Sequence, residues 1–267
     1  RYLPSSYRKA GEFMSSVFIR QMRAEKLKAR HKKAILVPLG FLLFQILWAI
    51  WQISSMDPQE LPDGYMMFLY QLPPMNAIML PLMLSVIASR ICDMEVKGDT
   101  MKILFTLQKR TGFFDCKYLT CLKYLLVFVA GQGVMLPVLG TVNHFGSLKI
   151  SLYLLYLLVT FTVSAVILCI QQFLSLISEN QLLPLGVGLA GCFLGLFSMF
   201  FPAPVARLVL WGYYALFSCV GMNWDSEINK ILGYYEIPFP TVSFLLFLAA
   251  GVLIYLICRT IIQKKEV

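Results

Sequence analysis

The sequence predicts an all-α integral membrane protein with six transmembrane helices, and three observations support this fold class. First, the chain has 267 residues, of which 58% are hydrophobic and only 14% are charged, about half the charge of a typical soluble domain. Second, it contains six apolar runs of about 20 residues, the length at which a helix crosses a bilayer. Third, almost all of its 23 Lys and Arg residues fall into three clusters. This composition excludes an ordinary soluble enzyme, a disordered chain and a disulfide-stapled secreted module.

Two segments precede the first span. Residues 1–13 lack an initiating Met and an amphipathic pattern, and Met14 follows at once, so we expect them to be a non-native leader. Residues 14–33 combine many basic residues with a partial apolar stripe, which predicts an amphipathic helix in the cytosolic membrane interface. A simple basic anchor for the first span explains the same charges equally well. The charged residues singled out on this helix are Arg23, Glu25, Lys26, Lys28 and Arg30.

The spans follow in order along a single transmembrane domain, 34–262. They are expected at residues 34–54, 66–89, 118–142, 150–177, 182–201 and 241–262, with a cytosolic tail at 263–267. One further apolar run, 204–220, is only about 17 residues long and carries Arg207, so it is short for a crossing.

The distribution of charge decides between six and seven crossings. With six spans, all but three of the Lys and Arg residues lie on the side that holds both termini. The three exceptions are Lys149, Arg207 and Lys230. Because basic loops stay in the cytosol, both termini are expected there, and the number of crossings must be even. The run 204–220 is therefore expected to re-enter the membrane from the outer face and return.

The sequence offers no arrangement typical of catalysis or metal binding. It contains no HExxH, phosphate-binding loop or CxxC motif, and His31 and His144 are isolated. No Asp or Glu lies in the middle of a span, which disfavours an ion-coupled carrier. We therefore expect no catalytic residue, no metal and no cofactor on this chain. The net charge of +9 is interpreted as a topology signal rather than a nucleic-acid surface.

The segment 90–119, between the second and third spans, is too long and too patterned for a simple hairpin. Gly98 can end one short helix, and Asp99 or Thr100 can cap the next. Leu104 and Leu107 then share an apolar face at helical spacing. A docking surface for a cytosolic partner is favoured over a loop that only connects two spans.

Three glycines of the fifth span, Gly188, Gly191 and Gly195, allow a neighbouring helix to approach closely. Packing within the chain and a seam between two copies of the chain are both open interpretations.

The same segment carries a family resemblance. The run Glu95-Val96-Lys97-Gly98-Asp99-Thr100, with Leu104, Leu107, Lys109, Arg110 and Lys117 after it, resembles the loop between spans two and three of type-2 ABC (ABC-2) exporter permeases. It departs from that pattern by placing Asp99 between the Gly and the Thr, and by lacking the proline frequent in the turn. The stretch from Arg23 to His31, leading to Pro38, is similar to the amino terminus of lantibiotic-protection permeases.

The resemblance implies one membrane half of an exporter in the bacterial plasma membrane. Such a permease would pair with a second copy or a paralogue and with two cytosolic ATP-binding subunits, which hold the ATP and Mg. The residues implied in coupling to those subunits are Glu95, Gly98, Thr100, Leu104, Leu107, Lys109, Arg110 and Lys117. The implied cargo is a cationic, amphipathic antimicrobial peptide, so that export gives immunity or resistance. Export of another amphiphile (a lipid, toxin or drug), an ATPase-independent channel or carrier, and a membrane scaffold remain alternatives.

Overall fold

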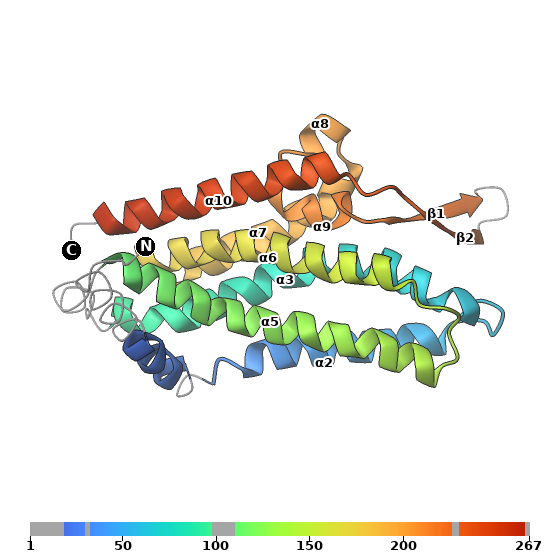
Figure 1. Cartoon of the computed structure of the whole chain (residues 1–267), viewed down its shortest axis with the longest axis horizontal. Helices are drawn as coiled ribbons and strands as arrows, with labels where there is room; N and C mark the ends of the chain where they lie inside the picture. The colour runs from blue at the N-terminus through green and yellow to red at the C-terminus, as the bar shows by residue number, and fades with distance from the viewer. Residues whose placement is uncertain (1–18, 30–32, 98–109, 226–229, 265–267) are drawn as a thin grey trace, which may run out of the picture.

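A computed structural model describes residues 19–29, 33–97, 110–225 and 230–264. Six long helices run side by side along the length of the molecule (Figure 1), and each is long and apolar enough to cross a membrane. They are α2 (Leu36–Ser54), α3 (Gly64–Lys97), α5 (Arg110–Val142), α6 (Ile150–Ile177), α7 (Leu182–Phe197) and α10 (Thr241–Lys264). The six predicted spans are confirmed as helices, and the bounds of α6 coincide with the prediction.

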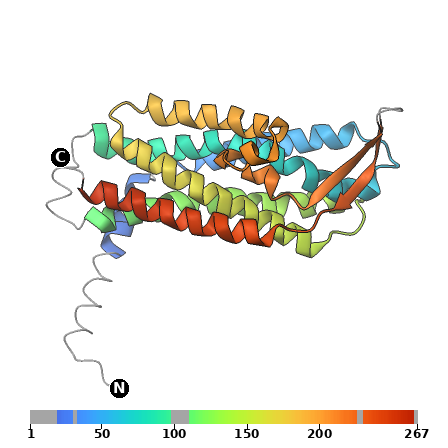
Figure 2. The ribbon, with the colours of Figure 1, turned by 90° about the horizontal axis from the view of Figure 1, so that it is seen from above.

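Both ends of the described chain lie at the same end of this bundle. The helix over residues 19–29, called here the amino-terminal helix, and the last turn of α10 are found at one end in both views (Figures 1 and 2). We call this the basic end, and the opposite one the hairpin end. The arrangement agrees with an even number of crossings, while a cytosolic location for the basic end stays a prediction.

The centre of the bundle is α3, which packs against α5, α6 and α7. Leu84 and Ile87 of α3 meet Leu125 and Phe128 of α5 in the main apolar core, and all four are fully buried. By contrast, α2 and α10 expose most of their apolar side chains, as expected of helices that face lipid or another membrane chain.

Two helices extend further than predicted at the basic end. The helix α3 ends at Lys97 instead of residue 89, and α5 begins at Arg110 instead of residue 118. The sequence prediction took the limits of each apolar run as the limits of its span. The structure continues both helices because polar side chains in the added turns find partners on neighbouring helices.

The region between α7 and α10 departs from the all-α prediction. After α8 (Ala203–Ala206), a 3-10 turn at Leu210–Gly212 and α9 (Tyr213–Leu216), the strands β1 (Val220–Asp225) and β2 (Lys230–Glu236) form an antiparallel hairpin. The pairing shifts at a bulge between Asn223 and Trp224, so neither strand shows the long regular alternation by which strands are recognised in a sequence. The expectation of a chain without strands was therefore wrong.

The hairpin rests on the end of α3. Tyr234 packs against Tyr70 at a ring distance of 5.9 Å. Burial and the nearby carboxylates of Glu60 and Asp63 raise the pKa of Tyr234 to about 12, so this tyrosine is neutral at physiological pH. An exposed ion pair between Lys149 and Glu236 fastens β2 to the start of α6.

The predicted re-entrant run, 204–220, contains most of α8, one 3-10 turn, α9 and the first residue of β1, so it forms no seventh crossing helix. Its aromatic residues face inward: Tyr214 is 1% exposed, and its hydroxyl lies 2.8 Å from Ser164 of α6. Entry of this segment into the membrane stays a prediction.

Candidate functional site

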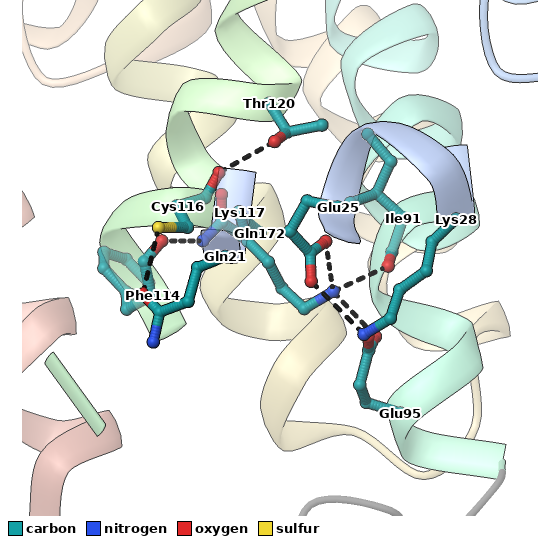
Figure 3. A network of polar contacts seen from close by, with 10 residues as sticks. All are labelled: Gln21, Glu25, Lys28, Ile91, Glu95, Phe114, Cys116, Lys117, Thr120 and Gln172. Atoms are coloured by element: carbon teal, nitrogen blue, oxygen red, sulfur yellow. Dashed lines mark hydrogen bonds and ion pairs between the residues drawn. The ribbon is translucent and has the colours of Figure 1, made fainter. Parts of the chain in front are cut away.

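The most highly charged interior site of the described chain lies at the basic end, where the amino-terminal helix crosses the end of α3 and the start of α5 (Figure 3). Gln21, Glu25 and Lys28 are spaced at i, i+4 and i+7, so they share the helix face that meets the bundle. Glu95 lies in the last turn of α3, and Lys117 lies two turns into α5. We call Glu25, Lys28, Glu95 and Lys117 the Lys117 cluster.

At the centre of the cluster is the ammonium group of Lys117, whose side chain is fully buried. It donates to Glu95 Oε2 at 2.7 Å, to Glu25 Oε2 at 3.2 Å and to the carbonyl oxygen of Ile91 at 3.0 Å. An ammonium group has three donors, and each of them has a partner here. Lys28, which is partly exposed, reaches the remaining oxygens of Glu95 at 2.9 Å and of Glu25 at 3.4 Å.

Two carboxylates and two ammonium groups thus balance one another in a largely buried site. Isolated buried charges are costly, but a buried charge whose partners are all present is tolerated. Removing one member leaves another buried and unpaired, which typically costs about 3–5 kcal/mol. The cluster therefore holds three separate helix segments in one arrangement.

Further contacts fasten the first turns of α5 on both sides. Towards the amino-terminal helix, the Cys116 thiol donates to Gln21 Oε1 at 3.4 Å. Towards α10, the guanidinium of Arg259 donates to both oxygens of Asp115, at 3.0 and 2.9 Å. Tyr255 adds a hydroxyl donor to Asp115 at 2.6 Å. The start of α5 therefore joins the amino-terminal helix to α10.

The sequence had placed Glu95 and Lys117 in a coupling element and Glu25 and Lys28 on an interface helix, without relating the two groups. The structure brings these four residues together. Arg23 and Lys26 lie on the exposed face of the amino-terminal helix, which leaves the predicted contact with lipid headgroups untested. Arg110 is the first residue of α5. The remaining predicted residues, Arg30, Gly98, Thr100, Leu104, Leu107 and Lys109, lie outside the described residues.

The three glycines of α7 face the interior of the chain. A Cβ at Gly188 would lie 2.5 Å from Ser85 Oγ of α3, and one at Gly191 would lie 2.4 Å from Trp211 Nε1. At Gly195 it would meet the backbone oxygens of Trp211 and Ala77 at 3.0 and 3.1 Å. In the structure these glycines therefore serve packing within the chain. A contact between two copies of the chain stays a prediction, and it would have to involve the exposed face of α7 instead.

A second polar group, in the middle of the bundle, was missed by the sequence analysis. Gln45 of α2, Asn76 of α3, Gln132 of α5 and Tyr156 of α6 are all buried, and each comes from a different helix. With Thr160 they form what we call the Asn76 cluster. Single amide side chains inside apolar runs were the available signal, since such groups bond across helices in membranes.

Both the amide oxygen and the amide nitrogen of Asn76 form hydrogen bonds. Its oxygen accepts from Gln132 at 2.9 Å and from Gln45 at 3.4 Å, and its nitrogen donates to Tyr156 at 2.9 Å. Gln132 also donates to Gln45 Oε1 at 2.7 Å, and the Tyr156 hydroxyl donates to Gln132 Oε1 at 3.1 Å. This closed set of neutral hydrogen bonds ties four spans together without a net charge.

Within the described ranges, no three His, Cys, Asp or Glu side chains gather closely enough to hold a metal ion. Neither the Lys117 cluster nor the Asn76 cluster contains such a set.

Comparison with known proteins agrees with this picture. A model of the ABC-2 family transporter proteins matches residues 21–195, well over half of the chain, from the amino-terminal helix into α7. The chain belongs to the ABC-2 transporter family. Chains of this family are the membrane subunits of ABC transporters; they are distinct from the ATPase and normally work with ATP-binding subunits. No curated protein and no solved structure matches the chain.

The match includes all four residues of the Lys117 cluster and all five of the Asn76 cluster. It ends before the hairpin and α10. The sequence-based resemblance is confirmed at the level of the ABC-2 family, and the lantibiotic subgroup is not supported by any match.

Proposed function

We propose that this chain is the permease subunit of an ATP-driven exporter and that the Lys117 cluster transmits movement of the ATP-binding subunits to the spans. The observation that carries this proposal is the buried Lys117, which joins the amino-terminal helix, α3 and α5 through Glu25 and Glu95.

The position of the cluster supports this role. Residues 98–109, which contain the proposed coupling helix, connect α3 to α5, and Glu95 and Lys117 lie close to the two ends of that connection. A displacement of the connection would therefore act first on the helix ends that the cluster holds. Because breaking the buried ion pairs is costly, α3, α5 and the amino-terminal helix would move together.

Family membership supports the proposed assembly. Two permease copies, identical or paralogous, would bind two cytosolic ATP-binding subunits, which carry the ATP and Mg. The proposed site is the bacterial plasma membrane, with the basic end in the cytosol. The exposed basic residues Arg23 and Lys26 would then lie among anionic headgroups.

We further propose that the cargo is a cationic, amphipathic antimicrobial peptide, which leaves the membrane toward the hairpin end. That end carries the carboxylates of Asp57, Glu60, Asp63 and Asp225, and acidic side chains attract a cationic peptide.

The test is co-expression of the chain with ATP-binding subunits, followed by pull-down and by ATPase measurements with and without a lantibiotic. Glu95→Gln removes one carboxylate from the cluster, and Asp115→Asn removes one from the neighbouring ion pair with Arg259 as a matched control. Peptide stimulation is expected to fall at least tenfold in Glu95→Gln and to change little in Asp115→Asn, with both variants still binding the ATPase.

Equal behaviour of the two variants would show that the cluster has no special part in coupling. A chain that binds no ATPase and carries ions alone in liposomes would favour the channel or carrier alternative. ATPase stimulation by a lipid or a drug, but by no peptide, would keep the exporter and replace its cargo.

A further inference from the structure

An apolar groove of about 660 Å3 lies between α10 and the segment that contains α8 and α9. In Figure 1, α8 stands out from the bundle above the first half of α10. The α10 side of the groove is formed by one face of the helix, with spacings of i, i+3, i+4, i+7, i+8 and i+11. These residues are Ser243, Leu246, Phe247, Ala250, Gly251 and Ile254.

The length of the groove matches one leaflet of a bilayer. From Ser243 to Ile254 the helix rises about 16 Å at about 1.5 Å per residue. The hydrocarbon core of a bilayer is about 30 Å thick, so one leaflet contributes about 15 Å. The first turn of α10 is the end of this helix that points toward the hairpin (Figure 1), so in a bilayer the groove would run from the membrane surface on that side toward the midplane, as an acyl chain does.

The opposite wall is apolar and projects from the protein. Leu208 and Leu216 line this wall and are 84% and 37% exposed, and both would be in contact with water if this segment lay outside the membrane. The floor of the groove is closed where α10 crosses α6, since a Cβ at Gly251 would lie only 2.6 Å from Val166. The surface is thus shaped to hold an apolar chain lengthwise.

The outer end of the groove is positively charged. Arg207, at the end of α8, is exposed and lines the groove. Among the described residues, no carboxylate lies within ion-pair distance of its guanidinium. The first turn of α10, which contains Ser243, adds the partial positive charge of a helix amino terminus. A negative group at the end of an apolar chain would complement both features.

We propose that this groove binds one anionic phospholipid from the leaflet at the hairpin end, with its phosphate at Arg207 and one acyl chain along α10. A guanidinium is suited to this role because it donates two parallel hydrogen bonds to phosphate oxygens, while the stem of the side chain lies against apolar surface. This site is separate from the Lys117 cluster and requires no ATPase.

Native mass spectrometry of the purified full chain can test the proposal. The chain is incubated with phosphatidylglycerol, with phosphatidylcholine and with inorganic phosphate, and the bound molecules are counted. One phosphatidylglycerol is expected to be retained about fivefold more strongly than phosphatidylcholine, the preference that a single basic residue gives near a membrane surface. Inorganic phosphate is expected to bind weakly, because it lacks the acyl chain.

Three variants separate the parts of the site. Arg207→Gln is expected to abolish the preference for phosphatidylglycerol, and Ala250→Trp, which fills the groove, to reduce retention of both lipids. Lys149→Gln removes another exposed cation, one that is paired with Glu236 outside the groove, and should behave as wild type. If Ala250→Trp does not fold, Ala250→Leu is used in the same assay.

Several outcomes would overturn the proposal. Equal loss of preference in Arg207→Gln and Lys149→Gln would indicate a general surface charge effect. Inorganic phosphate that displaces the lipid at similar concentration would indicate an anion site without a lipid chain. Protection of Ala250→Cys from a membrane-soluble maleimide that rises with chain concentration would place a second copy of the chain in the groove.

Discussion

The Lys117 cluster and the Asn76 cluster both join side chains from several helices, but they differ in charge and in position. The Lys117 cluster joins the ends of three helix segments through two fully paired carboxylates. The Asn76 cluster joins the middles of four spans through neutral amides and hydroxyls. Loss of one partner therefore leaves a buried charge in the first cluster and only an unpaired dipole in the second, so the two are expected to differ in strength.

This difference suggests a division of roles. Neutral hydrogen bonds in the middle of the spans fix the relative positions of α2, α3, α5 and α6. Ion pairs at the basic end, together with the contact between Gln21 and Cys116, add the amino-terminal helix. The following substitutions test this contrast, from the largest expected effect to the smallest.

Lys117→Met is expected to have the largest effect. It leaves the carboxylates of Glu25 and Glu95 close together, with only the partly exposed Lys28 to balance them. The expected loss is about 3–5 kcal/mol in the free energy of unfolding, measured by reversible denaturation in mixed micelles. Lys28→Met, which removes the exposed member of the same cluster, should cost clearly less. Equal losses in the two variants would contradict the central role of Lys117.

Gly191→Ala tests steric packing, and its expected effect on the free energy of unfolding lies between the effects expected for the two polar clusters. The added Cβ would lie 2.4 Å from Trp211 Nε1, and overpacking of this kind costs about 1–3 kcal/mol. Gly186→Ala on the same helix is a matched control, because a Cβ there meets nothing within 4 Å. It should be neutral or slightly stabilising. A neutral Gly191→Ala would show that α7 can move away from Trp211 without cost.

Gln132→Leu tests the Asn76 cluster. The change removes a donor to both Gln45 and Asn76 and an acceptor for Tyr156. Hydrogen bonds between membrane helices contribute about 0.6 kcal/mol on average and at most about 1.7, so a loss of about 1–2 kcal/mol in the same assay is expected. A loss as large as that of Lys117→Met would remove the proposed contrast between charged and neutral clusters.

Lys149→Ala is expected to have the smallest effect. Its ion pair with Glu236 is about half exposed on both sides, and exposed pairs contribute about 0–1 kcal/mol. The measurement is repeated at low and high salt, since screening should erase any loss that is found. A loss of several kcal/mol that persists at high salt would show that Lys149 contributes through more than an exposed ion pair, and would contradict the contrast between exposed and buried pairs.

Sequence reasoning was most successful where a single segment carries the signal. Each span was recognised from its own apolar run, and the ABC-2 resemblance depended on a short stretch from Glu95 to Lys117. It was least successful for the hairpin, whose strands are short and joined through a bulge. It also ended α3 too early and began α5 too late, because the added turns lie beyond the apolar runs, are polar and are stabilised by residues distant in the chain.

The sequence by itself determined the membrane location, the six spans and the family, because hydrophobic length and local motifs are properties of consecutive residues. Only the tertiary structure decided which polar residues meet. Glu25 and Lys117 are separated by 92 positions, and Asn76 and Tyr156 by 80. Which face of each helix contacts its neighbours depends on the packing of the whole bundle. That packing brings polar residues from different helices together in the two clusters.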